Sequence, residues 1–530
     1  MFQLKWVWKQ MADVRKRYIF ALCSTAVLSV MALGNSMITA NIMDTVFQPL
    51  VDTGVVTPEV IRHLAVLVAV LIGFTLFRTS FQYLSVMTYE TCSQKLVYKL
   101  RRDLYKNMQE QDQAFYSKTR TGDLMTRLTG DLDMVRFAVS WVLRQLIDCS
   151  VLFLTTTITF LVTDWLFALS MLAVTPVIFA LTYAFSKQVH PLYVDLRERL
   201  SQLNTCAQEN ISGNRVVKAF AKEDYEIEKF EKENDKFRDA QINASKIWMQ
   251  YIPIFEILSY SLTLILMLYG GYLAIQGEIT LGDLVRVNGY LWMLNTPLRM
   301  AGWWVNDIQN FVTSVEKIYA TYSEEPKVAQ PRTGGIHKKI MGNVEFKNVS
   351  YSADDEDIVK DISFKAAAGQ TVGIIGSTGA GKSTLMNLLC RFYDATSGEV
   401  LVDGRDVRTL DLYNLRDNIG MAMQDVFLFS DTVEGNIAYG RPNCSFEEVK
   451  HAAIMADANH FISAMPEGYD TIVGERGVGL SGGQKQRISL ARALLKDPAI
   501  LILDDTTSAV DMETESYIQN QLKNLQKSCT

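Results

Sequence analysis

Residues 371–384 read TVGIIGSTGAGKST, and this stretch decides the fold of the C-terminal part of the chain. The apolar, β-branched run at 371–375 predicts a strand, and the apolar run after Lys382 predicts a helix. The loop between them has the pattern G-x-x-x-x-G-K-S, in which glycines let backbone N–H groups surround phosphates at a helix N-terminus. The stretch therefore predicts an α/β fold with a P-loop that binds a nucleotide.

The loop supplies most of the predicted ATP-binding residues, which are Gly376, Ser377, Thr378, Gly379, Ala380, Gly381, Lys382, Ser383 and Thr384. Lys382 is expected to reach the β and γ phosphates, and the hydroxyl of Ser383 to coordinate Mg²⁺. A second apolar strand, AILIL at 499–503, ends in Asp504 and Asp505. Because the carboxyl ends of neighbouring parallel strands meet at one crevice, we expect Asp504 to hold Mg²⁺ and Asp505 to face the γ phosphate.

Another helix start lies upstream of this second strand. The segment LSGGQKQR at 480–487 places a serine and two glycines before a helical run, which predicts a second anion-binding N-terminus. A strand that merely ends in a turn is the alternative interpretation of Asp504 and Asp505. The presence of LSGGQKQR just before them disfavours that alternative.

Composition excludes some classes of function and differs between the N-terminal and C-terminal parts of the chain. The chain has 530 residues, 48% of them hydrophobic, and a formal net charge of −6, which argues against a nucleic-acid partner held by bulk charge. Seven cysteines without a CxxC pair indicate neither a disulfide framework nor a zinc site. Long runs almost free of charge fill the sequence up to about residue 305, whereas short apolar runs alternate with polar turns after 340.

The uncharged runs predict an α-helical transmembrane domain with six spans, because a crossing helix needs about 20 mostly apolar residues. The six stretches are 18–40, 63–87, 140–163, 165–187, 250–275 and 281–304. The last two are the least apolar, since they carry Glu256, Arg286 and Arg299. Charged residues inside spans, including Arg78, Arg144 and Asp148, are candidates for function. Alternatively, Arg144 and Asp148 simply pair with each other along one helix face.

Lys and Arg flank the spans unevenly, and this asymmetry predicts the orientation. The long connections 88–139 and 188–249 are rich in basic residues, so they and both termini are expected in the cytosol of a protein that crosses the cell membrane. Residues 1–17 fit an interfacial helix in contact with membrane lipid, with a frayed basic tail as the alternative. The expected parts are this helix, a transmembrane domain at 18–322, a linker at 323–340 and a nucleotide domain at 341–530.

The order of motifs resembles one superfamily. The P-loop, LSGGQ and ILILDD-TTSAVD resemble the ATP-binding cassette (ABC) superfamily, and six preceding spans resemble an exporter-type half-transporter. Residues 115–135 and 209–223 resemble the family's two cytosolic loops, each ending in a short coupling helix that docks on the nucleotide domains. The resemblance implies a dimer that uses ATP and Mg²⁺ to export amphipathic or hydrophobic drugs, lipids or peptides.

The resemblance also implies roles for single residues. Tyr351 would stack on adenine, Gln424 would sense Mg²⁺ next to the catalytic carboxylate, and Asp511 would signal between the two sites. Residues 474–477 would contact the partner's loops. The signature residues Leu480, Ser481, Gly482, Gly483 and Gln484 would complete the partner's ATP site.

Two features depart from the family pattern. Asp505 stands where the family usually has glutamate, which withdraws the carboxylate by about 1.5 Å and predicts slow hydrolysis at this site. This resembles the degenerate site of heterodimeric exporters, so we expect a heterodimer, with a homodimer as the alternative. In addition, no histidine follows Asp511, and the chain stops at Thr530 before the strands expected to close the sheet, so the nucleotide domain is expected to be incomplete.

Two other classes of function compete with an exporter. An ATP-gated channel or regulatory subunit would also suit slow hydrolysis. A soluble mechanical ATPase shares the LSGGQ chemistry, but six fused spans argue against it. Nothing in the sequence identifies the transported substrate.

Overall fold

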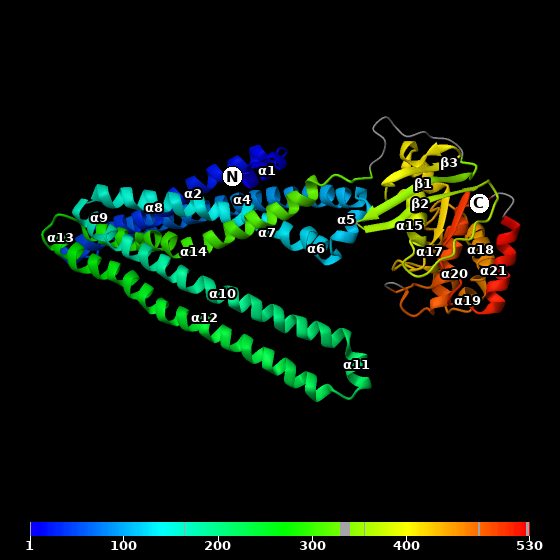
Figure 1. Ribbon diagram of the computed structural model, residues 1–530. Coiled ribbons are helices and arrows are strands. Elements are labelled where there is room, and N and C mark those ends of the chain that lie inside the picture. The colour runs from blue at the N-terminus through cyan, green and yellow to red at the C-terminus, as the bar shows by residue number, and fades with distance from the viewer. Residues whose placement is uncertain (1, 164, 329–339, 354–355, 475–476, 526–528) are drawn as a thin grey trace. The chain divides into compact units, whose positions relative to one another are not determined.

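The computed structural model describes residues 2–163, 165–328, 340–353, 356–474, 477–525 and 529–530. The chain forms two compact units (Figure 1), Met1–Met108 with Gly122–Glu324, and Gln109–Thr121 with Glu325–Thr530. The described residues of the first unit are helical, and all described strands lie in the second. The predicted order, a helical domain followed by an α/β domain, is confirmed.

Long helices make up the first unit. In chain order they are α1 (Phe2–Gln10), α2 (Arg15–Ile42), η1 (Met43–Phe47), α3 (Gln48–Thr53), α4 (Pro58–Glu110), α6 (Thr121–Thr126), η2 (Arg127–Asp131), α7 (Leu132–Phe137), η3 (Ala138–Val142), α8 (Leu143–Thr163), α9 (Trp165–Leu172), α10 (Val174–Ser212), α11 (Asn214–Ala219), α12 (Glu223–Ile265), η4 (Leu266–Gly270), α13 (Gly271–Ile275) and α14 (Leu281–Ser323). The four η segments are π-helical turns inside longer helices. α4 alone has 53 residues, or about 80 Å, and therefore exceeds a hydrocarbon core of about 30 Å.

Among the described residues, five helical stretches are long and apolar enough to cross a membrane. They are Arg15–Val51, Pro58–Glu110, Thr121–Thr163, Ala168–Ser212 and Glu223–Ile275. Four of them contain the first, second, third and fifth predicted spans, and Ala168–Ser212 contains all but the first three residues of the fourth. The sixth predicted span, 281–304, lies in α14, which does not meet the same criterion. The predicted count of six spans is therefore not exact by this criterion, because Asp283, Arg286 and Asn288 make the start of α14 polar.

The core of the first unit lies where α2, α8 and α14 pack together. Tyr290 of α14 is fully buried, and its hydroxyl donates to the carbonyl of Leu33 at 3.0 Å. The candidate charges have separate partners: Asp148 accepts a hydrogen bond from Ser29 at 2.6 Å, and the guanidinium of Arg144 lies 4.8 Å from the centre of the Trp141 ring. The side chain of Arg299 lies outside the described residues.

The N-terminal helix α1 packs against the end of α14. The ring of Trp6 is buried and meets Tyr319 and Tyr322 edge-on, with centroids 5.7 and 5.6 Å apart. α10 and α12 run side by side over much of their length (Figure 1). By contrast, the most apolar window of α4 contains no buried residue, so this surface is free for lipid or a second subunit.

The second unit contains two sheets among its described residues. An antiparallel sheet has the order β2-β1-β3-β4, and a parallel sheet pairs β5 with β6. The strands are β1 (Val344–Ala353), β2 (Glu356–Ala366), β3 (Ser397–Val402), β4 (Arg405–Asp406), β5 (Ile419–Ala422) and β6 (Ile500–Leu503). The helices are α5 (Gln113–Lys118), α15 (Lys382–Leu389), η5 (Val407–Thr409), α16 (Leu412–Asp417), α17 (Val433–Ala438), α18 (Phe446–Met455), α19 (Asn459–Ser463), η6 (Gly468–Asp470), α20 (Gly482–Leu495) and α21 (Met512–Leu525).

Alternating side chains hold the antiparallel sheet on its core. Val344 and Phe346 of β1 are buried whereas Lys347 is exposed, and the ring of Phe346 stacks on Phe364 of β2 at 4.6 Å. A second apolar cluster joins α17, α18 and α20 through residues such as Ile437, Ala453 and Ile488. These two cores fix the elements from which the P-loop and LSGGQ project.

The predicted strand 371–375 does not form a strand in the structure, and this prediction is corrected. β6 pairs with β5 along one edge, and its other edge exchanges backbone hydrogen bonds with Thr530, whose nitrogen donates to Ala499 at 3.0 Å. Among the described residues, 371–375 belong to neither sheet, and Val372 and Ile375 are exposed. A β-branched run forms a strand only beside a neighbouring strand, so this segment stays irregular.

Candidate functional site

The P-loop folds around the side chain of Lys382, the first residue of α15. The ammonium group donates to the carbonyls of Gly376 and Ser377 at 2.8 and 2.9 Å. Gly379 and Gly381 have φ values of 83° and 82°, which favour glycine. A Cβ on Gly381 would also lie 2.7 Å from Val359, so two constraints require glycine there.

Oxygen ligands meet where α15 starts and β6 ends. The hydroxyl of Ser383 donates to the carboxylate of Asp504 at 2.7 Å. A hydroxyl and a carboxylate at this separation are the donor set that Mg²⁺ accepts beside phosphate oxygens. The residues present therefore fit the predicted magnesium ion.

A cavity of about 1080 Å³ joins these groups to the rest of the predicted site. Its lining includes the loop from Thr378 to Thr384, together with Gln424, Asp504 and Asp505. The fold thus brings together residues from three separated segments of the chain. Tyr351 on β1 does not belong to this lining; its ring packs on Tyr393 with centroids 5.4 Å apart.

Asp505 sits in a left-handed conformation, with φ of 54°. Aspartate tolerates this region better than most residues, and the turn directs its side chain into the lining of the cavity. Its backbone carbonyl accepts a hydrogen bond from the Gln486 amide at 3.3 Å. The position of Asp505 is therefore held by a residue of the LSGGQKQR helix.

The LSGGQ segment opens α20 with a capping box. Ser481 accepts from the Gln484 N–H at 3.3 Å, and the Gln484 side chain accepts from the Ser481 N–H at 2.9 Å. A Cβ on Gly483 would lie 2.7 Å from the carbonyl oxygen of Ala509, so this helix start packs tightly on the segment after Asp505. None of Leu480 to Gln484 lines the cavity of the P-loop.

Gln486 is a site residue that sequence reasoning missed. Its side chain is 8% exposed and spans the turn after β6: the amide donates to Asp505 and Ser508, and its oxygen accepts from the Ala509 N–H at 3.2 Å. The available signal was a second glutamine, two residues after Gln484, on a helix rich in apolar residues.

Asp511 caps the following helix, α21. Its carboxylate accepts from the Thr514 N–H at 3.1 Å, and this hydrogen bond lowers the pKa of Asp511 from its ordinary value. Of the predicted partner-contacting segment, Gly474 and Gly477 are described, whereas Glu475 and Arg476 lie outside the described residues.

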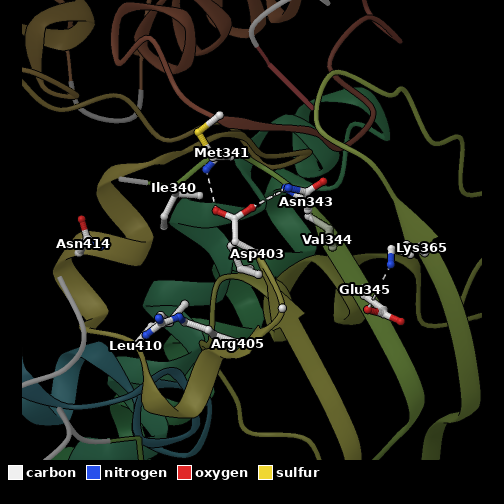
Figure 2. A pocket seen from close by; sticks show the side chains of 12 residues that line it. Ile340, Met341, Asn343, Val344, Glu345, Lys365, Asp403, Arg405, Leu410 and Asn414 are labelled. Carbon is white, nitrogen blue, oxygen red and sulfur yellow. Dashed lines mark hydrogen bonds and ion pairs between the residues drawn. The ribbon is translucent and has the colours of Figure 1, made fainter. Parts of the chain in front are cut away.

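A second pocket, of about 320 Å³, lies where the chain enters β1 (Figure 2). Asp403 points into it and accepts hydrogen bonds from the backbone N–H groups of Met341 and Asn343 at 2.6 and 2.9 Å. Burial alone would raise the pKa of Asp403, but these hydrogen bonds lower it overall. No residue predicted for the nucleotide site lines this pocket, so Asp403 serves to anchor the start of β1.

Comparisons with known families match both units. Residues 18–298 match the family "ABC transporter transmembrane region", and residues 359–508 match the family "ABC transporter". The chain therefore belongs to the ABC transporters, with a membrane part and an ATP-binding part fused in one polypeptide.

Relatives and a solved structure narrow the class. The ABC transporter ATP-binding protein YknU of Bacillus subtilis (strain 168) is 40% identical over 82% of this chain and 75% of its own length. The ATP-dependent lipid A-core flippase of Syntrophus aciditrophicus (strain SB) is 35% identical over 84% of this chain and 74% of its own length. A bacterial Atm1-family ABC exporter with ATP bound matches with a TM-score of 0.76 at 27% identity, covering 98% of this chain and 90% of that one. The predicted class, an exporter-type half-transporter, is confirmed.

Proposed function

We propose that the chain is one half of a dimeric, ATP-driven exporter of amphipathic or hydrophobic molecules, namely drugs, lipids or peptides. The cavity that gathers the P-loop, Gln424, Asp504 and Asp505 carries this proposal, because it lies in the same chain as five apolar helices. The lipid A-core flippase among the relatives supports an amphipathic cargo. The protein would lie in the cytoplasmic membrane with both termini in the cytosol.

Each of these residues would have its own role in binding ATP and Mg²⁺. Lys382 would leave its two loop carbonyls for the β and γ phosphates, while loop N–H groups hold the remaining oxygens. Ser383, Asp504 and Gln424 would hold Mg²⁺, which neutralises charge on the phosphates. Tyr351 would stack on adenine from β1, outside the phosphate cavity.

Asp505 would position water for hydrolysis, and its side chain is one C–C bond shorter than that of the glutamate usual in the family. A displacement of about 1 Å can cost about a hundredfold in rate. We infer that this site binds ATP and turns it over slowly. The capped LSGGQ helix start would complete the partner's site, which favours a heterodimer, and Asp511 would relay signals between the sites.

The domain limits follow from the same reasoning. We propose an interfacial helix at 1–17, a transmembrane domain at 18–322, a linker at 323–340 and a nucleotide domain at 341–530. The buried contacts of Trp6 with Tyr319 and Tyr322 disfavour a frayed tail at the start of the chain.

Inverted membrane vesicles test the proposal. With Mg²⁺ and ATP, they should accumulate the dye Hoechst 33342, and Lys382→Ala should abolish accumulation. Lys347→Ala removes an exposed lysine from β1 and serves as the matched control. ATP-dependent ion conductance without dye accumulation would instead favour the channel.

A further inference from the structure

The carboxylate of Asp112 joins two segments that are far apart in the sequence. One oxygen accepts from the Phe115 N–H at 3.0 Å and so caps α5, in the first cytosolic connection. The other oxygen accepts from the N–H groups of Lys327 and Val328 at 2.6 and 3.3 Å. Lys327 and Val328 lie at the start of the linker, so one side chain holds the coupling segment and the linker together.

Two further hydrogen bonds also join the first cytosolic connection to the end of α14 and the linker. The amide of Asn107, in α4, donates to the carbonyl of Glu324 at 3.2 Å, and the guanidinium of Arg127 donates to the hydroxyl of Thr321. The first cytosolic connection therefore follows the C-terminal end of α14 and the linker at several successive points. In these four hydrogen bonds the charged acceptor is the Asp112 carboxylate, and charge-assisted bonds to backbone N–H groups are the stronger kind.

The negative charge of Asp112 also acts on an aromatic residue of the nucleotide domain. The ring of Tyr393 packs on Tyr351, the proposed adenine platform, with centroids 5.4 Å apart and planes inclined by 41°. Burial raises the pKa of Tyr393, and the negative charge of Asp112 raises it further. Ring packing thus links Tyr393 to the proposed adenine platform, and hydrogen bonds link Asp112, whose charge acts on Tyr393, to the linker.

We propose that Asp112 is a positioning residue that ties α5 to the linker, so that these two segments respond together to nucleotide at the Tyr351–Tyr393 pair. α4 ends at Glu110 and α14 at Ser323, so both helices leave the membrane domain within a few residues of the Asp112 contacts. A shift of Tyr393 on nucleotide binding would move α5 and the linker as one piece. This inference rests on the proposed export function.

Hydrogen exchange of the full chain tests the contact directly. In the wild type, the amides of Lys327 and Val328 should exchange slowly, and adding AMP-PNP with Mg²⁺ should change their rate. Asp112→Ala should speed exchange at both amides and remove the nucleotide effect. Asp411→Ala is the matched control, because Asp411 also caps a short helix, α16, through the Asn414 N–H at 2.8 Å.

Transport measurements test the consequence. In inverted vesicles, Asp112→Ala should bind TNP-ATP normally but move at least about fivefold less Hoechst 33342 per ATP hydrolysed, the lower bound of usual coupling energies. Unchanged exchange at Lys327 and Val328, an unchanged transport ratio, or an equal loss in Asp411→Ala would overturn the inference. A wild type that hydrolyses ATP but accumulates no dye would contradict the export function, whereas the exchange experiment would still decide the role of Asp112.

Discussion

Asp505 is the residue on which the proposed slow hydrolysis depends. We predict that Asp505→Glu raises the ATPase rate by about tenfold to a hundredfold, because the longer side chain brings the carboxylate one C–C bond closer to the γ phosphate. Asp505→Asn should lower the rate, since the carboxylate charge is lost. Steady-state phosphate release from purified protein measures both. An unchanged rate in Asp505→Glu would show that the short side chain does not limit hydrolysis.

Gln486 joins the LSGGQ helix to the turn that carries Asp505. Gln486→Glu keeps the oxygen that accepts from Ala509 but loses the amide that donates to Asp505. We therefore predict that Gln486→Glu lowers the ATPase rate, while Gln486→Ala both lowers it and destabilises the domain by about 1–3 kcal/mol. Thermal unfolding and ATPase assays on the same preparations separate the two effects. Wild-type activity in both variants would contradict this role.

At the scale of elements, the start of α20 depends on the close approach of Gly483 to the backbone of Ala509. Gly483→Ala would place a methyl group 2.7 Å from the Ala509 oxygen, whereas the methyl of Gly482→Ala would lie 3.6 Å from Ala509 Cβ, an ordinary contact. We predict that Gly483→Ala destabilises the protein by about 1–3 kcal/mol. Gly482→Ala should be neutral or slightly stabilising, since alanine favours helices. Chemical denaturation compares the pair, and equal effects would refute the steric argument.

The entrance to β1 depends on the charge of Asp403. Its pKa is lowered in the folded state, so its contribution to stability is complete above the unfolded value near 3.9 and is lost as pH falls through the folded pKa. We predict that Asp403→Asn lowers the melting temperature at pH 7. The difference from the wild type should shrink when the pH is lowered from 5 towards 3. A difference independent of pH would mean that packing, not charge, anchors β1.

Some helices and strands follow from their local sequence, and others do not. β1 alternates buried and exposed side chains as its pattern indicates, and α15 begins at the P-loop lysine. Segment 371–375 has an equally strong strand pattern, yet it belongs to neither described sheet. α14 is a continuous helix that carries too many polar residues to meet the apolar criterion of the other spans.

For the whole molecule, the proposed slow hydrolysis at Asp505 and the intact LSGGQ segment together predict a heterodimer. A companion half with glutamate at the position equivalent to Asp505 should form a complex with this chain. The 1:1 mixture should hydrolyse ATP at least about tenfold faster than this chain alone, because only the partner's site would carry the full-length carboxylate. Size-exclusion chromatography and ATPase titration measure the complex. Equal rates with and without the companion would favour a homodimer.

The sequence by itself determined the class of protein, the two-part organisation and the residues that gather at the P-loop. These features are local, because apolar runs and glycine-rich loops set backbone preferences within a few residues. Only the tertiary structure decided that Gln486 holds Asp505, that Asp112 joins α5 to the linker and that residues 371–375 belong to neither described sheet. Each of these outcomes depends on a backbone or side-chain partner far away in the sequence, and no local pattern specifies which partner a buried amide or a carboxylate will meet.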